Sequence, residues 1–204
     1  IQDQLTTTKH FIVLTSEEQM PESSLPGLLC YETLLAEETS EFDWPDLDER
    51  TACSMCYTSG TTGNPKGVLY HHRSTILHTY AQAMPDVFGV SASDCILPIV
   101  PMFHVNAWGS VYVGPMVGTK IVLPGAKMGD GETLQHLIET EGITVSMGVP
   151  TVWLNLLAYL NESGKSVPTL KRLYVGGAAC PSSVITEMKD KYGVYVHVAW
   201  GMTE

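Results

Sequence analysis

A stretch rich in glycine and hydroxyl groups, with one lysine, is the part of this sequence best suited to bind a polyphosphate. It reads Tyr-Thr-Ser-Gly-Thr-Thr-Gly-Asn-Pro-Lys-Gly at residues 57–67 and directly follows a predicted strand. Glycines let backbone N–H groups approach phosphate oxygens closely, hydroxyls donate to those oxygens, and Lys66 supplies a compact positive charge. The candidate nucleotide contacts in this stretch are Thr58, Ser59, Gly60, Thr61, Thr62, Gly63 and Lys66.

This loop differs from the Walker phosphate loop. The Walker pattern requires glycine before its lysine and serine or threonine after it, whereas Pro65 and Gly67 flank Lys66 here. An ordinary surface turn would account for the glycines and the asparagine, but not for so many hydroxyls beside a single lysine. Phosphate binding is therefore the favoured interpretation of the stretch.

Three further stretches complete the set of informative motifs. They read Pro-Met-Phe-His-Val-Asn-Ala-Trp at 101–108, Val-Gly-Gly-Ala-Ala-Cys-Pro at 175–181, and Trp-Gly-Met-Thr-Glu at 200–204. Together with the loop, the first and last of these resemble, in order and approximate spacing, motifs of the adenylate-forming superfamily. That superfamily contains acyl-CoA synthetases, luciferases and peptide-synthetase adenylation domains. The stretch at 175–181 is similar to the family's adenine-side loop, so the resemblance covers residues 51–204.

The resemblance implies a two-step ligation. A carboxylate attacks the α-phosphate of MgATP to give an acyl-adenylate and pyrophosphate, and the thiol of coenzyme A then displaces AMP. Within the family, the stretches at 101–108 and 175–181 most resemble medium- and long-chain fatty acyl-CoA ligases. Other ligases, acting on aryl acids or amino acids or stopping at the acyl-adenylate, stay open, as does a nucleotide- or acyl-binding module without turnover.

The resemblance also implies roles for the nucleotide-side residues. Thr203 would contact phosphate and Glu204 would help to hold magnesium, for which a carboxylate is a suitable hard oxygen ligand. Trp200 replaces the commoner tyrosine that stacks on adenine, and its indole keeps the stacking face but loses the hydroxyl. The remaining nucleotide contacts implied by the family are Gly201, Gly177 and Ala178.

On the acid side, the resemblance places His104 where the acyl carboxylate meets the α-phosphate. Val105, Trp108 and Gly176 would line the acyl site. Each has a purely structural alternative: a lone histidine often has a structural role, tryptophan often packs in a core, and paired glycines often allow close helix–strand packing. The predicted catalytic set is Lys66, His104, Thr203 and Glu204.

The elements that must position these motifs alternate between strand-like and helical patterns. This order predicts an α/β fold with a mixed, largely parallel sheet flanked by helices. The predicted strands are 10–15, 52–58, 95–100, 120–123, 143–148, 172–175 and 194–199, and the predicted helices are 31–38, 133–141, 151–161 and 181–192. Because ligands bind beyond the carboxyl ends of strands in open α/β sheets, we expect the four motifs to converge on one edge of one sheet.

Charge and cysteine content narrow the class of protein further. The chain has 22 acidic and 11 basic residues, and 12 of the acidic ones lie in the first 50 positions, which argues against a nucleic-acid partner. We expect residues 1–50 to be an acidic peripheral segment and residues 51–204 the central ATP- and acyl-binding part of an adenylation domain. Five cysteines without a signal peptide favour a reducing cytoplasm.

Several weaker signals lead to negative or open expectations. The uncharged run 95–119 is interrupted by proline and glycine, so it predicts buried interior rather than a membrane span. Cys53 and Cys56 have zinc-like spacing but lack a second pair and fall on a strand predicted to be buried. Three histidines, His71, His72 and His78, are expected in a helix after the loop, without a metal role. A homodimer is left open.

The chain is expected to be a fragment of a longer enzyme. In the family, a ribose-binding aspartate, a hinge and a small domain with a catalytic lysine follow the position of Glu204. We therefore expect the isolated chain to be inactive or to turn over poorly, since a truncated sheet also leaves exposed edges.

Overall fold

The computed structural model describes residues 4–58 and 63–204. It divides into two compact units, one ending at Leu47 and the other running from Asp48 to Glu204. The first unit contains the parallel strand pair β1 (Phe11–Val13) and β2 (Leu28–Cys30), with a 3₁₀ turn (Glu17–Gln19) and helix α1 (Tyr31–Ala36). All candidate site residues belong to the second unit.

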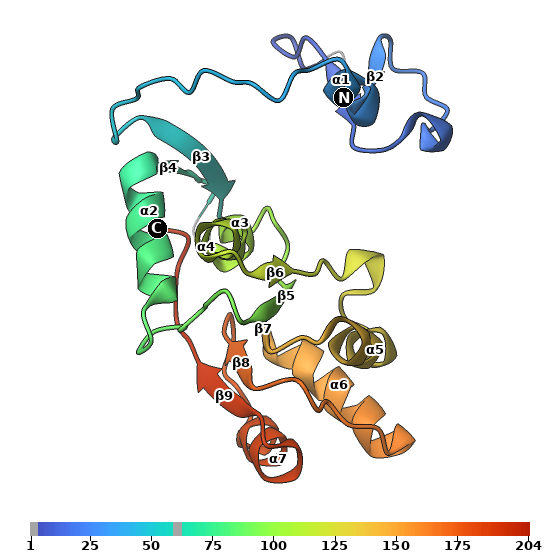
Figure 1. Cartoon of the computed structure of the whole chain (residues 1–204), viewed down its shortest axis with the longest axis vertical. Helices are drawn as coiled ribbons and strands as arrows, with labels where there is room; N and C mark the ends of the chain where they lie inside the picture. Colours follow the sequence, from blue (N-terminus) through green and yellow to red (C-terminus); the bar gives the residue numbers. More distant parts are fainter. Residues whose placement is uncertain (1–3, 59–62) are drawn as a thin grey trace. The chain divides into compact units, whose positions relative to one another are not determined.

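A five-stranded parallel sheet forms the centre of the second unit (Figure 1). Its strand order is β6-β5-β7-β8-β9, and every pairing in it is parallel. The strands are β5 (Cys95–Ile99), β6 (Lys120–Ile121), β7 (Val145–Gly148), β8 (Arg172–Val175) and β9 (Tyr195–Val198). This confirms the predicted α/β fold with a largely parallel sheet. Both β5 and β7 are buried along their whole length, as is usual for central strands of a parallel sheet.

Helices cover both faces of this sheet and create two apolar clusters. Leu97 and Ile99 point to the face covered by α5 (Gly131–Glu141), α6 (Pro150–Ser163) and α7 (Ser182–Tyr192). Ile96 and Val100 belong to the cluster on the opposite face, which also includes residues of α3 (Val105–Trp108) and α4 (Ser110–Val117). The alternation of side chains along β5 thus separates the two layers.

Local signals in the sequence explain where the crossover helices begin and end. The carboxylate of Asp130 accepts a hydrogen bond from the Thr133 N–H at 2.9 Å and caps α5 at its N-terminus. Pro150 occupies the first turn of α6, where its missing N–H costs nothing. Gly142 ends α5 at a φ of 71°, a left-handed conformation that glycine adopts without penalty.

One prediction about the sheet is wrong. Strand β3 (Ala52–Tyr57), which leads into the glycine-rich loop, pairs antiparallel with β4 (Gly67–His71) in a separate two-stranded sheet. The chain returns after a short loop, which permits an antiparallel hairpin but leaves no room for the crossover that a parallel pair requires. Three of the four motifs therefore follow strands of the parallel sheet, and the loop belongs to the hairpin.

The hairpin also corrects the expectations for nearby side chains. His71 ends β4 and accepts a hydrogen bond from the Ser74 N–H, so only His72 and His78 lie in helix α2 (His72–Ala83). Cys56 is buried, as predicted, but Cys53 is exposed, because β3 has solvent on one side. Within the described residues, none of the helices is long and apolar enough to cross a membrane.

Candidate active site

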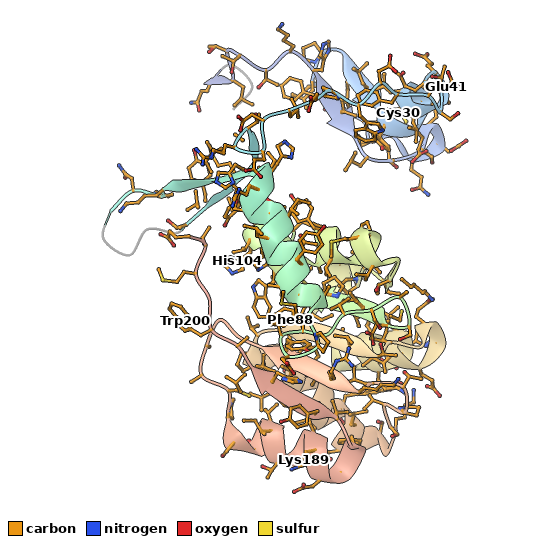
Figure 2. All side chains as sticks on the ribbon, turned by 60° about the vertical axis from the view of Figure 1, so that its left-hand side comes forward. Cys30, Glu41, Phe88, His104, Lys189 and Trp200 are labelled. Carbon is orange, nitrogen blue, oxygen red and sulfur yellow. The ribbon has the colours of Figure 1, made fainter. Side chains whose placement is uncertain are left out.

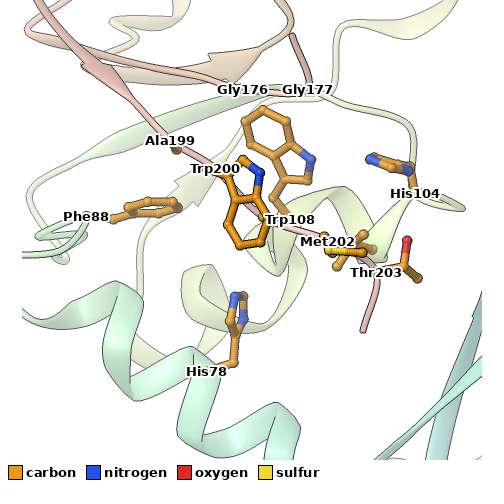
Figure 3. A pocket seen from close by; sticks show the side chains of 12 residues that line it. His78, Phe88, His104, Trp108, Gly176, Gly177, Ala199, Trp200, Met202 and Thr203 are labelled. Carbon is orange, nitrogen blue, oxygen red and sulfur yellow. The ribbon is translucent and has the colours of Figure 1, made fainter. Parts of the chain in front are cut away.

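A cavity of about 360 Å³ lies at the carboxyl ends of β8 and β9 (Figures 2 and 3). Its walls come from α2, from the segment that joins α2 to β5, from the turn after β5, and from the segments that follow β8 and β9. The lining residues are His78, Phe88, His104, Val105, Trp108, Gly176, Gly177, Ala199, Trp200, Gly201, Met202 and Thr203. Three sequence motifs that are far apart in the chain thus meet around one cavity.

Close backbone contact fixes the wall next to Trp108. The Gly176 N–H donates to the Gly148 carbonyl at 3.3 Å, and the Ala199 N–H donates to the Val175 carbonyl at 2.8 Å. A Cβ atom on Gly176 would lie 3.0 Å from the Ala199 oxygen and 3.1 Å from Cη2 of Trp108. Glycine thus allows the indole to lie close against the end of β8, beside which Figure 3 shows it, and a larger residue would force its neighbours to move by a few tenths of an ångström.

The motif after β5 forms an unusual backbone turn. Four consecutive residues without glycine, Val105–Trp108, have φ between 48° and 55°, and Gly109 continues the turn at 81°. Left-handed backbone costs an L-residue about 1–2 kcal/mol, and a β-branched valine tolerates it poorly. Such conformations persist where the surroundings enforce them and are concentrated at functional sites. The two ends of this turn, Val105 and Trp108, both line the cavity.

Helix α2 supplies the wall opposite the sheet. His78 projects from α2 toward the two indoles in Figure 3, and atoms packed around its ring lower its pKa, which favours the neutral form at pH 7. Gln82, one helical turn further on, is buried and donates from Nε2 to the Trp108 carbonyl oxygen. A Cβ atom on Gly109 would lie 2.6 Å from this amide nitrogen. The helix thus packs tightly against the end of the left-handed turn.

The glycine-rich loop is closed at its base by the hairpin. The Thr58 N–H donates to the Lys66 carbonyl at 2.8 Å, and the Lys66 side chain is exposed. On β4, the hydroxyl of Tyr70 donates to the carbonyl oxygen of Thr203. Burial, followed by the charges of Cys56 and Glu204, raises the pKa of Tyr70, so the hydroxyl stays protonated as a donor. The hairpin is thereby tied to the segment that lines the cavity.

The structure brings most of the predicted acid-side and adenine-side residues to the cavity. Eight of them line it: His104, Val105, Trp108, Gly176, Gly177, Trp200, Gly201 and Thr203. Five others lie outside its lining: Thr58, Gly63, Lys66, Ala178 and Glu204. Ser59, Gly60, Thr61 and Thr62 lie outside the described residues.

Sequence reasoning missed four of the lining residues. Ala199 ends a predicted strand, Met202 lies within the motif at 200–204, and Phe88 belongs to no predicted element or motif. Only the tertiary fold shows that these three residues face the cavity. His78 carried a signal, because its spacing of four residues from Gln82 places both on one face of a helix. Tyr70 was missed because β4 was not predicted. In the part of the chain that the structure describes, no three His, Cys, Asp or Glu side chains form a metal-binding group.

The chain belongs to the AMP-binding enzyme family, whose model matches residues 4–204. It is 52% identical over its whole length to a medium-chain-fatty-acid–CoA ligase from Ectopseudomonas oleovorans, covering 37% of that protein. It is 51% identical over its whole length to a 3-methylmercaptopropionyl-CoA ligase from Ruegeria lacuscaerulensis, covering 38% of that protein. The chain therefore spans well under half the length of these relatives.

Comparison of structures leads to the same fold. The crystal structure of an anthranilate CoA ligase in complex with anthranoyl-AMP aligns with the whole chain at a TM-score of 0.86. The chain covers 38% of that structure at 22% sequence identity. This likeness shows that the two chains share a fold over the whole length of the present chain.

Proposed function

We propose that the protein activates a fatty acid with ATP and transfers the acyl group to coenzyme A. The observation that carries this proposal is the cavity at the strand ends, where the His104, Gly176 and Trp200 motifs meet. The names of the two relatives above, both CoA ligases of carboxylic acids, support the same reaction. In the first step an acid oxygen bonds to the α-phosphorus and pyrophosphate leaves; in the second the thiol sulfur bonds to the acyl carbon and AMP leaves.

In this proposal the two sides of the cavity bind different parts of the substrates. The exposed indole of Trp200 stacks on adenine, while Gly177 and Ala178 allow the base to lie against the backbone. His104 meets the carboxylate, and the indole of Trp108 bounds the acyl chain. Alignment of the two reactants in a restricted space supplies much of the rate enhancement.

Charge neutralisation falls to the hairpin and to the last residues of the chain. Lys66 and the backbone of its loop would offset the charge of the phosphates, and Thr203 would contact them. Glu204 follows the residue whose carbonyl oxygen Tyr70 binds, and its carboxylate suits a magnesium ion, which proteins bind through one or two carboxylates together with substrate phosphates. Bound magnesium would neutralise phosphate charge during adenylation.

The role of Glu204 is tested by magnesium dependence. Because a neutral amide is a weaker ligand than a carboxylate, Glu204→Gln should require several-fold more magnesium for half-maximal activity in the native-length protein. Glu162→Gln, which changes an exposed carboxylate on α6, is the control and should titrate like the parent. An unchanged magnesium titration in Glu204→Gln would count against metal ligation.

ATP–pyrophosphate exchange by the native-length protein tests the function itself, because exchange reports adenylation without the thiol step. The panel is octanoate, palmitate, acetate, benzoate, amino acids and 3-methylmercaptopropionate. Exchange with octanoate or palmitate is expected, and CoA should then yield the thioester. Exchange with benzoate or an amino acid alone would overturn the assignment of a fatty acid as the substrate. No exchange with any acid would favour a binding module without turnover.

Two narrower expectations stay predictions. Sedimentation of the native-length protein tests the homodimer, and cell fractionation tests the cytoplasmic location. Neither result bears on the chemistry of the cavity.

A further inference from the structure

The left-handed turn Val105–Trp108 carries a residue whose side chain reaches away from the cavity. We propose that Asn106 is a positioning residue, which locks this turn onto strand β3 and so orients His104 and Trp108 toward the acid. The identity of the acid as the substrate rests on the proposed function. The role of Asn106 is argued from its contacts in the structure.

The turn is held to its neighbours through side chains and burial. Its internal hydrogen bonds run from the Gly109 N–H to the carbonyl oxygens of Val105 at 3.2 Å and Asn106 at 3.0 Å. A right-handed helix offers bonds of the same kind without the steric penalty, so these bonds do not select the left-handed form. Selection must come from contacts outside the turn.

Asn106 makes two such contacts with β3. Its Nδ2 donates to Oγ of Ser54 at 3.2 Å, and the thiol of Cys56 donates to its Oδ1, with 3.7 Å between sulfur and oxygen. Ser54 and Cys56 are two residues apart on a strand, so both face the same side and hold both ends of one amide. Asparagine also tolerates positive φ better than other residues with a Cβ. Asparagine therefore suits this position in two ways: it tolerates the positive φ, and its amide makes both hydrogen bonds to β3.

The next two residues are fixed by other elements. Ala107 is fully buried in the cluster on that face of the sheet. The carbonyl oxygen of Trp108 accepts from the buried Gln82 on α2. Asn106 is thus the point at which the turn is attached to β3, and Gln82 the point at which it is attached to α2.

This arrangement connects the two halves of the site. His104 directly precedes the turn and Trp108 ends it, and both line the cavity. Strand β3 ends at Tyr57 and leads into the loop expected to bind phosphate. If the Asn106 amide is lost, the turn is free to relax toward a conformation of lower strain, and His104 and Trp108 move with it.

The test variants remove the hydrogen bonds of the Asn106 amide but keep a residue that tolerates positive φ at position 106. Asn106→Gly keeps a backbone that accepts φ of 51° but loses both hydrogen bonds. The double variant Ser54→Ala/Cys56→Ala removes the same bonds from the other side and leaves Asn106 in place. Asn155→Ala, which removes a hydrogen bond from an exposed asparagine of α6 to the Gly129 carbonyl, is the matched control.

Acid and MgATP titrations of pyrophosphate exchange in the native-length protein give the kinetic result. Both test variants should raise the KM for the acid by roughly tenfold, the effect of losing two hydrogen bonds of ordinary strength. The KM for MgATP should change less than twofold, and Asn155→Ala should match the parent. Combining all three substitutions should do no more than either test variant alone, because they remove the same contacts. Additive effects, or an unchanged acid KM in an active protein, overturn the proposal.

Amide hydrogen exchange gives a result that does not depend on activity. Peptides that cover the turn should exchange faster in both test variants than in the parent, while peptides from α6 should not. Equal protection of the turn overturns the proposal even if no acid supports exchange of pyrophosphate. Absence of pyrophosphate exchange in the parent protein would instead contradict the proposed function, so the two failures are distinguishable.

Discussion

The hydroxyl of Tyr70 donates a hydrogen bond to the carbonyl oxygen of Thr203, a residue 133 positions further along the chain. Tyr70 lies on β4, whose hairpin carries the glycine-rich loop, and Thr203 lines the cavity. The bond therefore holds the nucleotide-side segment against the hairpin. Burial raises the pKa of Tyr70, so the donor persists across the neutral range.

Loss of this hydroxyl should weaken nucleotide binding in particular. In Tyr70→Phe the ring is kept and one hydrogen bond is lost, so the KM for MgATP should rise by between about two- and tenfold. A MgATP titration of pyrophosphate exchange at saturating acid measures this KM. Tyr80→Phe, an exposed tyrosine of α2, is the control and should behave as the parent. A MgATP titration that coincides with that of the parent would show that the bond has no part in binding.

Lys66 is expected to contact the polyphosphate. Its side chain is exposed at the base of the loop, whose ends are joined by the Thr58–Lys66 backbone hydrogen bond. Lys66→Ala should raise the KM for MgATP roughly ten- to a hundredfold, the range for loss of a hydrogen bond to a charged group. Lys171→Ala changes an exposed lysine elsewhere and should have no such effect. Equal affinity and equal turnover in Lys66→Ala would exclude the contact.

Much of the sheet was predictable because its signals are local. Strands buried on both faces read as short apolar runs, and β5, β7, β8 and β9 all coincide with predicted segments. Strand β4 was missed because Gly67–His71 is short and only partly buried, and owes its conformation to pairing with β3. Antiparallel pairing depends on a partner strand, and no periodicity within five residues reveals it.

The site residues that belong to sequence motifs could be predicted, whereas those placed by tertiary contacts could not. The positions of Gly176 and Trp200 at strand ends followed from the pattern of strands and loops. The left-handed turn did not, because its four residues include no glycine and its contacts are with residues far away in the sequence, on β3 and α2. His78 likewise reaches the cavity only because α2 packs beside the turn.

The close approach of Gly176 to Trp108 makes a prediction about the acid. A methyl group at position 176 would lie 3.1 Å from the indole and 3.0 Å from the Ala199 oxygen, so the indole must shift. Gly176→Ala should raise the KM for the acid several-fold in pyrophosphate exchange and change that for MgATP less. Gly129→Ala adds a methyl group where no atom lies within 4 Å and is the control. Unchanged acid titrations would show that the acid does not contact this wall.

Beneath the site, Asp94 should stabilise the fold in a pH-dependent way. Its carboxylate accepts from Oγ1 of Thr144 at 2.8 Å and Nη2 of Arg172 at 3.0 Å, and from Ser91. Burial alone would raise the pKa of Asp94, but these donors outweigh it and hold the pKa below its ordinary value. At pH 7, Asp94→Asn should therefore lower the free energy of unfolding by about 2 kcal/mol, the range for hydrogen bonds to a charged group.

The pH dependence of this loss follows from the sign of the shift. Because the folded pKa lies below the unfolded value of about 3.9, the stabilisation is complete above that value and disappears as the pH falls through the folded pKa. Urea unfolding of Asp94→Asn should show the same decrease in the free energy of unfolding at pH 7 and pH 5, and a smaller decrease at pH 3. Glu141→Gln, which breaks the exposed ion pair with Lys120, should cost less than about 1 kcal/mol. A loss for Asp94→Asn that is no larger than this control, or that persists undiminished at pH 3, would contradict a charged and bonded Asp94.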